Sequence, residues 1–66
     1  MTLTLNGSPV ALEEGLTVAA LLQRLELSRE RVAIERNGSI LPRVAYEETR
    51  LAEGDRLEIV QFVGGG

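Results

Sequence analysis

The sequence predicts an α+β fold in which one main helix packs on one face of a mixed, four- to five-stranded sheet. Three observations support this prediction. Two stretches of alternating apolar and polar residues are each interrupted by Asn-Gly, a strong signal for a tight hairpin turn. One further stretch has apolar residues at helical spacing. The chain has 66 residues, so we expect a single small domain with one layer of each kind.

The first hairpin is predicted at the start of the chain. Leu3 and Leu5 alternate with threonines, and Asn6 and Gly7 then supply the turn because both positions tolerate a positive φ. Pro9 has no backbone N–H to donate, so this position is expected at an edge of the sheet or at a bulge. We expect the Asn-Gly pair to make this turn and nothing more.

A helix of about two to three turns is predicted next. Thr17 is a good N-cap residue. The four apolar positions after it, Val18, Leu21, Leu22 and Leu25, follow the i, i+3, i+4, i+7 pattern of one helix face. We expect this apolar stripe to pack on the sheet.

The second half of the chain predicts another hairpin and a final strand. Residues 32–36 alternate, Asn-Gly forms the turn, and residues 39–43 form a short return strand. Residues 44–51 have no clear period and are interpreted as a loop that can include one helical turn, which leaves 56–63 as the last strand. Hairpin, helix, hairpin and a central final strand beside the first make the β-grasp, or ubiquitin-like, fold. The predicted domains are a β-grasp domain, 1–63, and a flexible C-terminal glycine tail, 64–66.

The last strand is apolar on both of its faces. Leu57 and Ile59 share one face, while Val60 and Phe62 share the other. A single helix covers only one face of a small sheet, so the second apolar pair is either covered by another part of the chain or exposed. We favour exposure, and we expect Val60, Phe62 and the adjoining Val63 to form a partner-binding face.

Composition excludes most catalytic chemistry from the chain itself. It has no Cys, no His and no Lys, so it offers no thiolate, imidazole base or Schiff-base amine and no Cys- or His-ligated metal. We therefore expect a protein that is not an enzyme and whose charged side chains are solvated. With one Phe, one Tyr and no Trp, we also expect an aliphatic core. The net charge of −3 disfavours nucleic acid as a partner. The N-terminal residues show no signal peptide or membrane span, so we expect a cytoplasmic location.

The glycine run at the end of the sequence is the remaining candidate for function. Without a Cβ, Gly64 and Gly65 can thread a channel in a partner that is too narrow for other residues. The carboxylate of Gly66 is then the candidate reactive group, which a partner enzyme could activate by transferring AMP from ATP. The alternative is a frayed terminus with no function.

Short motifs along nearly the whole chain form an ordered set. They are Leu5-Asn6-Gly7, Gly15-Leu16-Thr17-Val18, Leu21-Leu22, Val32-Ala33-Ile34-Glu35-Arg36-Asn37-Gly38, Ile40-Leu41-Pro42-Arg43, Gly54-Asp55, Leu57-Glu58-Ile59-Val60 and Phe62-Val63-Gly64-Gly65-Gly66. This set resembles the bacterial sulfur carrier proteins of thiamine biosynthesis, which are related to the molybdopterin synthase small subunit and to ubiquitin.

The resemblance implies a function and a set of partners. An adenylating enzyme related to ubiquitin-activating enzymes would use ATP to activate Gly66, and the chain itself would bind no cofactor. The acyl adenylate would become a thiocarboxylate with sulfur from a donor such as a cysteine desulfurase, and thiazole synthase would accept that sulfur. Two alternatives stay open: a sulfur carrier for molybdopterin or tRNA thiolation, and a non-catalytic ubiquitin-like binding module with an inert tail.

Overall fold

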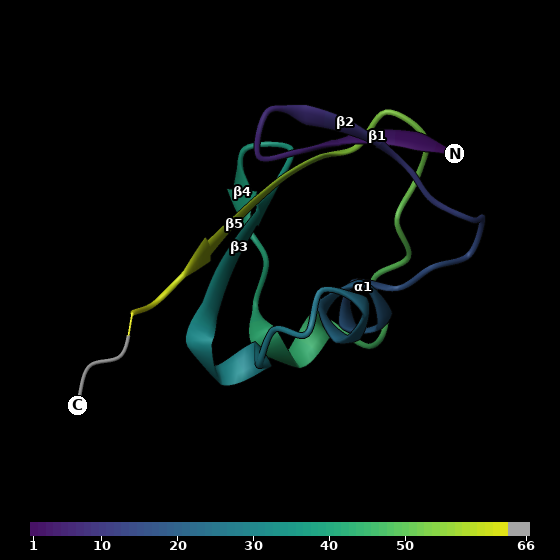
Figure 1. Ribbon diagram of the computed structural model, residues 1–66. Helices are drawn as coiled ribbons and strands as arrows, with labels where there is room; N and C mark the ends of the chain where they lie inside the picture. Colours follow the sequence, from purple (N-terminus) through teal and green to yellow (C-terminus); the bar gives the residue numbers. More distant parts are fainter. Residues whose placement is uncertain (64–66) are drawn as a thin grey trace.

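The computed structural model describes residues 1–63, and within them a five-stranded sheet curves across one helix (Figure 1). The strands are β1 (Thr2–Leu5), β2 (Ser8–Ala11), β3 (Val32–Arg36), β4 (Ser39–Ile40) and β5 (Arg56–Gln61). The helix is α1 (Val18–Arg24), and two 3₁₀ turns are η1 (Arg29–Arg31) and η2 (Arg43–Ala45).

The strand order is β2-β1-β5-β3-β4, so the last strand lies in the middle of the sheet. Strand β5 pairs parallel to β1 and antiparallel to β3, and the two hairpins occupy the two sides. Strand β2, which contains Pro9, is at an edge as predicted. A central last strand between two hairpins, with one helix on one face, is the predicted β-grasp arrangement.

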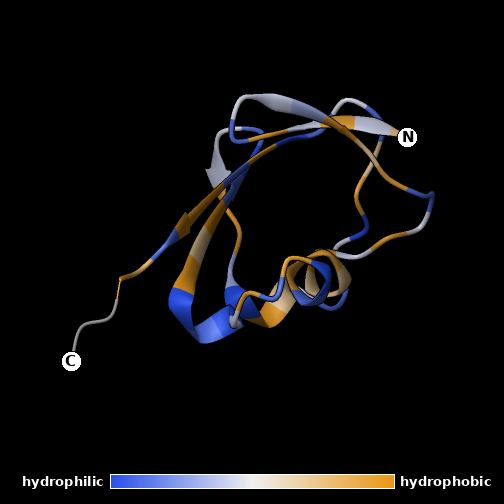
Figure 2. Cartoon of the chain, in the orientation of Figure 1, coloured by the Kyte–Doolittle hydropathy of each residue, from blue (hydrophilic) through white to orange (hydrophobic). Residues whose placement is uncertain are grey.

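The core lies between α1 and the face of the sheet that curves toward it. Figure 2 shows apolar residues along β3 and β5 and on α1. The buried side chains are Leu3, Leu16, Val18, Leu21, Leu22, Val32, Ile34, Tyr46, Leu51, Leu57 and Ile59. The prediction of a purely aliphatic core is wrong at Tyr46, which is 1% exposed and among the largest buried side chains.

The helix begins where the sequence predicts. The Thr17 hydroxyl oxygen accepts a hydrogen bond from the Ala20 N–H at 3.1 Å, which satisfies one of the free donors at the helix start. Three of the four predicted stripe residues are buried: Val18, Leu21 and Leu22. Within residues 1–63, no helix is both long and apolar enough to cross a membrane.

The fourth stripe residue, Leu25, is not buried. The helix ends at Arg24, and Glu26 adopts the left-handed conformation with φ 58°. The Leu27 N–H then donates to the Leu22 carbonyl at 2.9 Å, which is the bond that closes a Schellman motif. Because the chain turns away at this point, Leu25 is left 40% exposed and Leu27 packs against the core in its place.

Two strands are shorter than predicted. Strand β4 pairs over only two residues, because one further bond from the Leu41 N–H to the Ile34 carbonyl at 2.8 Å is followed by Pro42, which has no N–H. Strand β5 ends at Gln61 instead of residue 63. The strand ladder therefore stops before the end of the last predicted apolar stretch.

Candidate functional site

Strand β5, which leads to the glycines, is held by backbone bonds along its whole length. Near its start the Thr4 N–H donates to the Asp55 carbonyl at 2.9 Å, and just past its end the Phe62 N–H donates to the Arg31 carbonyl at 2.7 Å. Between these bonds it pairs with β1 on one side and β3 on the other. The position from which the tail departs is thus fixed by the sheet.

The side chain of Asn6 extends the pairing of β1 with β5. Strand β1 ends at Leu5, and Asn6 turns the chain with φ 48°. Its side-chain nitrogen donates to the Ile59 carbonyl at 3.2 Å, and its side-chain oxygen accepts from the Ile59 N–H at 2.7 Å. The expectation that this Asn-Gly pair only makes a turn is therefore wrong. The Asn6 side chain also makes two hydrogen bonds to the β5 backbone beyond the point where β1 ends.

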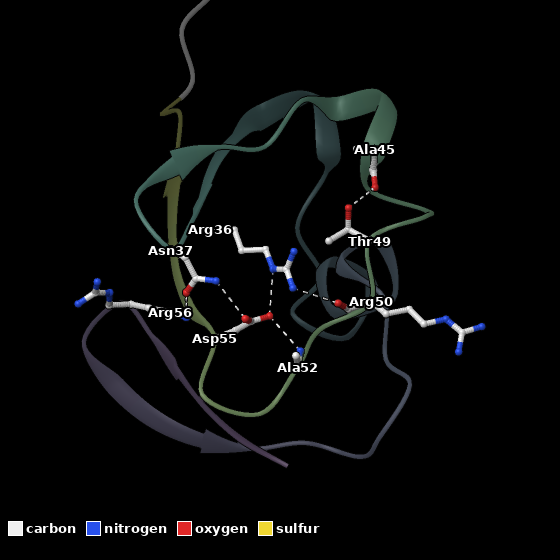
Figure 3. A network of polar contacts seen from close by, with 8 residues as sticks. All are labelled: Arg36, Asn37, Ala45, Thr49, Arg50, Ala52, Asp55 and Arg56. Atoms are coloured by element: carbon white, nitrogen blue, oxygen red, sulfur yellow. Dashed lines mark hydrogen bonds and ion pairs between the residues drawn. The ribbon is translucent and has the colours of Figure 1, made fainter.

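A buried carboxylate fixes the start of β5 (Figure 3). Asp55 is 6% exposed and accepts three hydrogen bonds, from Arg36 Nε at 3.0 Å, from Asn37 Nδ2 at 3.1 Å and from the Ala52 N–H at 2.9 Å. Asn37 in turn accepts from the Arg56 N–H at 2.9 Å. The network ties the β3–β4 turn to the loop before β5. The expectation of solvated surface charges alone is wrong for Asp55.

The pKa of Asp55 reflects two opposing effects. Burial alone would raise it, but the hydrogen bonds from Ala52 and Asn37 and the interaction with Arg36 outweigh burial, so the pKa lies below its usual value. The carboxylate form is therefore the one that the folded chain holds. All of its partners are structural, which assigns Asp55 to the support of β5 and not to chemistry.

This network predicts an acid-sensitive stability. Because folding lowers the pKa of Asp55, its contribution is full above the unfolded-state value of about 4 and is lost as pH falls through the folded-state value. Urea unfolding followed from neutral pH down to about pH 3 should show a falling free energy of unfolding. The Asp55→Asn variant should cost about 1–3 kcal/mol at neutral pH and lose less stability on acidification. An equal acid response in the variant would assign the effect to other carboxyl groups.

The predicted partner-binding face is exposed. Val60, Phe62 and Val63 are 58%, 50% and 95% exposed, so residues 1–63 do not cover them. Their neighbours Leu57 and Ile59 point to the opposite face and are buried under α1. The alternative of a locally covered pair is therefore wrong, while the role of this face in binding a partner stays a prediction.

A shallow hollow lies where β5 ends. It is lined by Arg31, Gln61, Phe62 and Val63. The ion pairs within residues 1–63 do not include Arg31. Sequence reasoning missed Arg31 here, because it is the pairing of β3 with β5, in which Val32 lies opposite Gln61, that brings the turn before β3 next to the end of β5.

The three glycines of the predicted tail, Gly64, Gly65 and Gly66, lie outside the described residues. Their predicted roles, and the boundary between domain and tail, therefore stay predictions. What the described residues fix is the starting point at Val63. From there three residues of extended chain reach about 10 Å.

Comparison with known proteins covers the whole chain. The ThiS family model matches residues 3–66. The chain is 40% identical over 65 residues to the sulfur carrier protein ThiS of Bacillus subtilis, covering 97% of this chain and 98% of that protein. The crystal structure of the thiamine biosynthesis protein ThiS from Geobacter metallireducens superimposes with a TM-score of 0.84 at 40% identity, covering both chains completely. This likeness confirms the predicted fold.

Other relatives are much longer. The chain is 42% identical over 66 residues to a thiazole synthase from Paramagnetospirillum magneticum, and to another from Magnetococcus marinus. It covers 20% of each of these proteins, so it spans one fifth of the length of these curated relatives. The match to the family over nearly all residues, together with a relative of equal length, decides the assignment. This chain belongs to the ThiS family.

Proposed function

We propose that this chain carries sulfur for formation of the thiazole ring in thiamine biosynthesis, on the carboxylate of Gly66. The observation that carries the proposal is the full-length likeness to the ThiS sulfur carrier of Bacillus subtilis, combined with a central strand that directs the chain toward three glycines. A partner supplies the catalysis, and this chain supplies the group that is modified.

The chemistry begins with a poor electrophile. A carboxylate resists substitution because its leaving group would be oxide. An adenylating partner solves this when a Gly66 oxygen attacks the α-phosphorus of ATP, which releases pyrophosphate and forms an acyl adenylate. The terminal sulfur of a persulfide on a donor such as a cysteine desulfurase then attacks the carbonyl carbon and AMP leaves. A thiol reduces the resulting acyl disulfide, which releases the carrier and leaves a mixed disulfide between the thiol and the donor. The product is a thiocarboxylate, and thiazole synthase accepts its sulfur.

The fold supports this proposal because a strand with a fixed position leads directly into glycines that can extend into a partner. Asn6 and Asp55 fix β5 in the middle of the sheet, so the partner meets a defined surface that ends at Val63. Beyond it, glycines without a Cβ suit a narrow active-site channel. The exposed side chains of Val60 and Phe62 lie beside this departure point and would position the domain while the glycines enter the partner.

The partner set follows from the proposal. It comprises an adenylating enzyme, a sulfur donor and thiazole synthase. The names of the longer relatives favour thiazole synthase, because a stretch similar to this chain forms part of proteins with that name. In those proteins the stretch similar to this chain and the remaining four fifths share one polypeptide.

Intact-mass spectrometry tests the proposal. The chain, ending at Gly66, is incubated with the adenylating enzyme of its own host, ATP and a sulfide source. We expect the mass to rise by the difference between one sulfur and one oxygen atom, and fragmentation to place the change on Gly66. The matched control omits ATP and should leave the mass unchanged. An unchanged mass would overturn the proposal, provided that the same enzyme preparation is shown to adenylate another carrier protein.

A further inference from the structure

Two carboxylates lie directly opposite each other on the open face of the sheet. Strands β3 and β5 are antiparallel, and Glu35 pairs with Glu58 in their register. Both side chains are exposed, and they alternate with the buried residues Ile34 and Ile59. Paired residues on antiparallel strands have Cβ atoms about 5 Å apart, so the two like charges repel.

No ion pair among the described residues neutralises these two carboxylates. Within residues 1–63, the ion pairs join other groups and include neither Glu35 nor Glu58. Arg56 shares the face two positions before Glu58, yet it too is absent from those ion pairs. Like charges directly opposite each other on paired strands weaken a sheet slightly.

Two exposed apolar side chains lie next to the pair. Ile40 on β4 is directly opposite Glu35, which places it on the same face, and it is 78% exposed. Val60, paired with Ala33 one step further along the strands, is 58% exposed. Ile40, Glu35 and Glu58 therefore form one row across the strands. The next row on the same face contains the exposed Val60. Sequence reasoning missed this row because the strand register is not visible in the sequence.

A partner that covers this face must also accommodate the two carboxylates. A surface that excludes water from Val60 and Ile40 also removes water from the two carboxylates between them. In water the repulsion is weak, but two desolvated like charges without a counterion are costly. A partner that covers this row therefore binds most favourably when it places a cation between the two carboxylates.

We propose that the open face of the sheet binds thiazole synthase, and that an Arg or Lys side chain of that enzyme enters between Glu35 and Glu58 while apolar groups contact Ile40 and Val60. This proposal rests on the proposed function and adds the chemistry of the contact. Thiazole synthase is chosen as the occupant because the longer relatives join a similar domain to a protein of that name. Such covalent joining keeps two surfaces at high effective concentration.

The test is a binding measurement with a matched charge control. Calorimetry compares the wild-type chain, the Glu35→Gln/Glu58→Gln variant and a Glu26→Gln/Glu48→Gln variant, each titrated with thiazole synthase of the same host. Glu26 and Glu48 are exposed, and within residues 1–63 their side chains make no ion pair. Both variants lose two negative charges, so only the place of the change differs.

We expect the Glu35/Glu58 variant to bind at least about tenfold more weakly, which corresponds to about 1.4 kcal/mol, and to unfold at no lower urea concentration than wild type. Its affinity should also depend less on salt. The control variant should bind within about twofold of wild type.

Three results would overturn the proposal: no binding of the wild-type chain, unchanged binding of the Glu35/Glu58 variant, or equal weakening of both variants. Sulfur loading of the wild-type chain, measured by intact mass, distinguishes failure of the proposed contact from failure of the proposed function. A chain that loads sulfur and binds through another face keeps the proposed function and rejects only this contact. A chain that gains no sulfur rejects the function itself.

Discussion

Addition of a single alanine after Gly66 is expected to abolish sulfur loading. The added residue converts the Gly66 carboxylate into a peptide bond and moves the new carboxylate about 3.5 Å further from the domain. It also places a Cβ at the terminus, where a channel shaped for glycine has no room. Intact-mass spectrometry after incubation with ATP, the adenylating enzyme and a sulfide source measures the effect.

The matched control is the same extended chain after a carboxypeptidase has removed the added alanine. This restores the Gly66 carboxylate and should restore sulfur loading. A deletion is less informative, because removal of any one of the three identical glycines gives the same shortened chain with a terminal Gly-Gly. Efficient loading of the extended chain would show that Gly66 is not the acceptor.

Leu21→Ala should lower the free energy of unfolding by about 2–5 kcal/mol. Leu21 is 2% exposed and lies on the face of α1 that packs on the sheet, so truncation leaves a cavity in the core. A domain of this size has a total stability of about 3–10 kcal/mol, which makes this loss a large share. Urea denaturation followed by circular dichroism measures it.

Leu25→Ala is the control for this experiment, because it makes the same chemical change one turn later. Leu25 caps the helix end and is 40% exposed, so we expect a loss below about 1 kcal/mol. Similar losses in the two variants would show that the Schellman turn at Glu26 does not separate a buried from an exposed position as described.

Periodicity predicted most of the fold because it reports burial. The alternation of residues 32–36 and the helical spacing after Thr17 place each element with its inner face correct. The prediction that the apolar stripe is buried was wrong at Leu25. The helix ends because Glu26 adopts the left-handed conformation, which its residue type does not indicate. Strand ends were also misplaced, since pairing partners decide where a ladder stops.

Polar and aromatic contacts between distant segments were not predictable from local pattern. Tyr46 comes from a stretch without period, yet tertiary packing buries it completely. Asn and Asp are common in turns, and only the assembled sheet shows that the Asn6 side chain bonds β5 and that the Asp55 carboxylate bonds Arg36 and Asn37. Local pattern reports the face of an element, whereas these contacts depend on which elements become neighbours.

The candidate site was predicted in outline. The exposure of Val60 and Phe62 followed from having one helix for two sheet faces, and the structure agrees. The choice among thiamine, molybdopterin and tRNA thiolation did not follow from physics, because these pathways use the same fold and tail. Membership of the ThiS family favours thiamine over the other two.

The two Asn-Gly turns also determine how the protein ages chemically. In such pairs the glycine nitrogen can attack the side-chain amide carbon, because no Cβ hinders it, and the asparagine is converted to an acid. At Asn6 this would replace the donor to the Ile59 carbonyl with an anionic oxygen, and at Asn37 it would set a second carboxylate against buried Asp55. Deamidation therefore acts on the two side chains that hold the central strand, and prolonged storage at alkaline pH would loosen the sheet at that strand first.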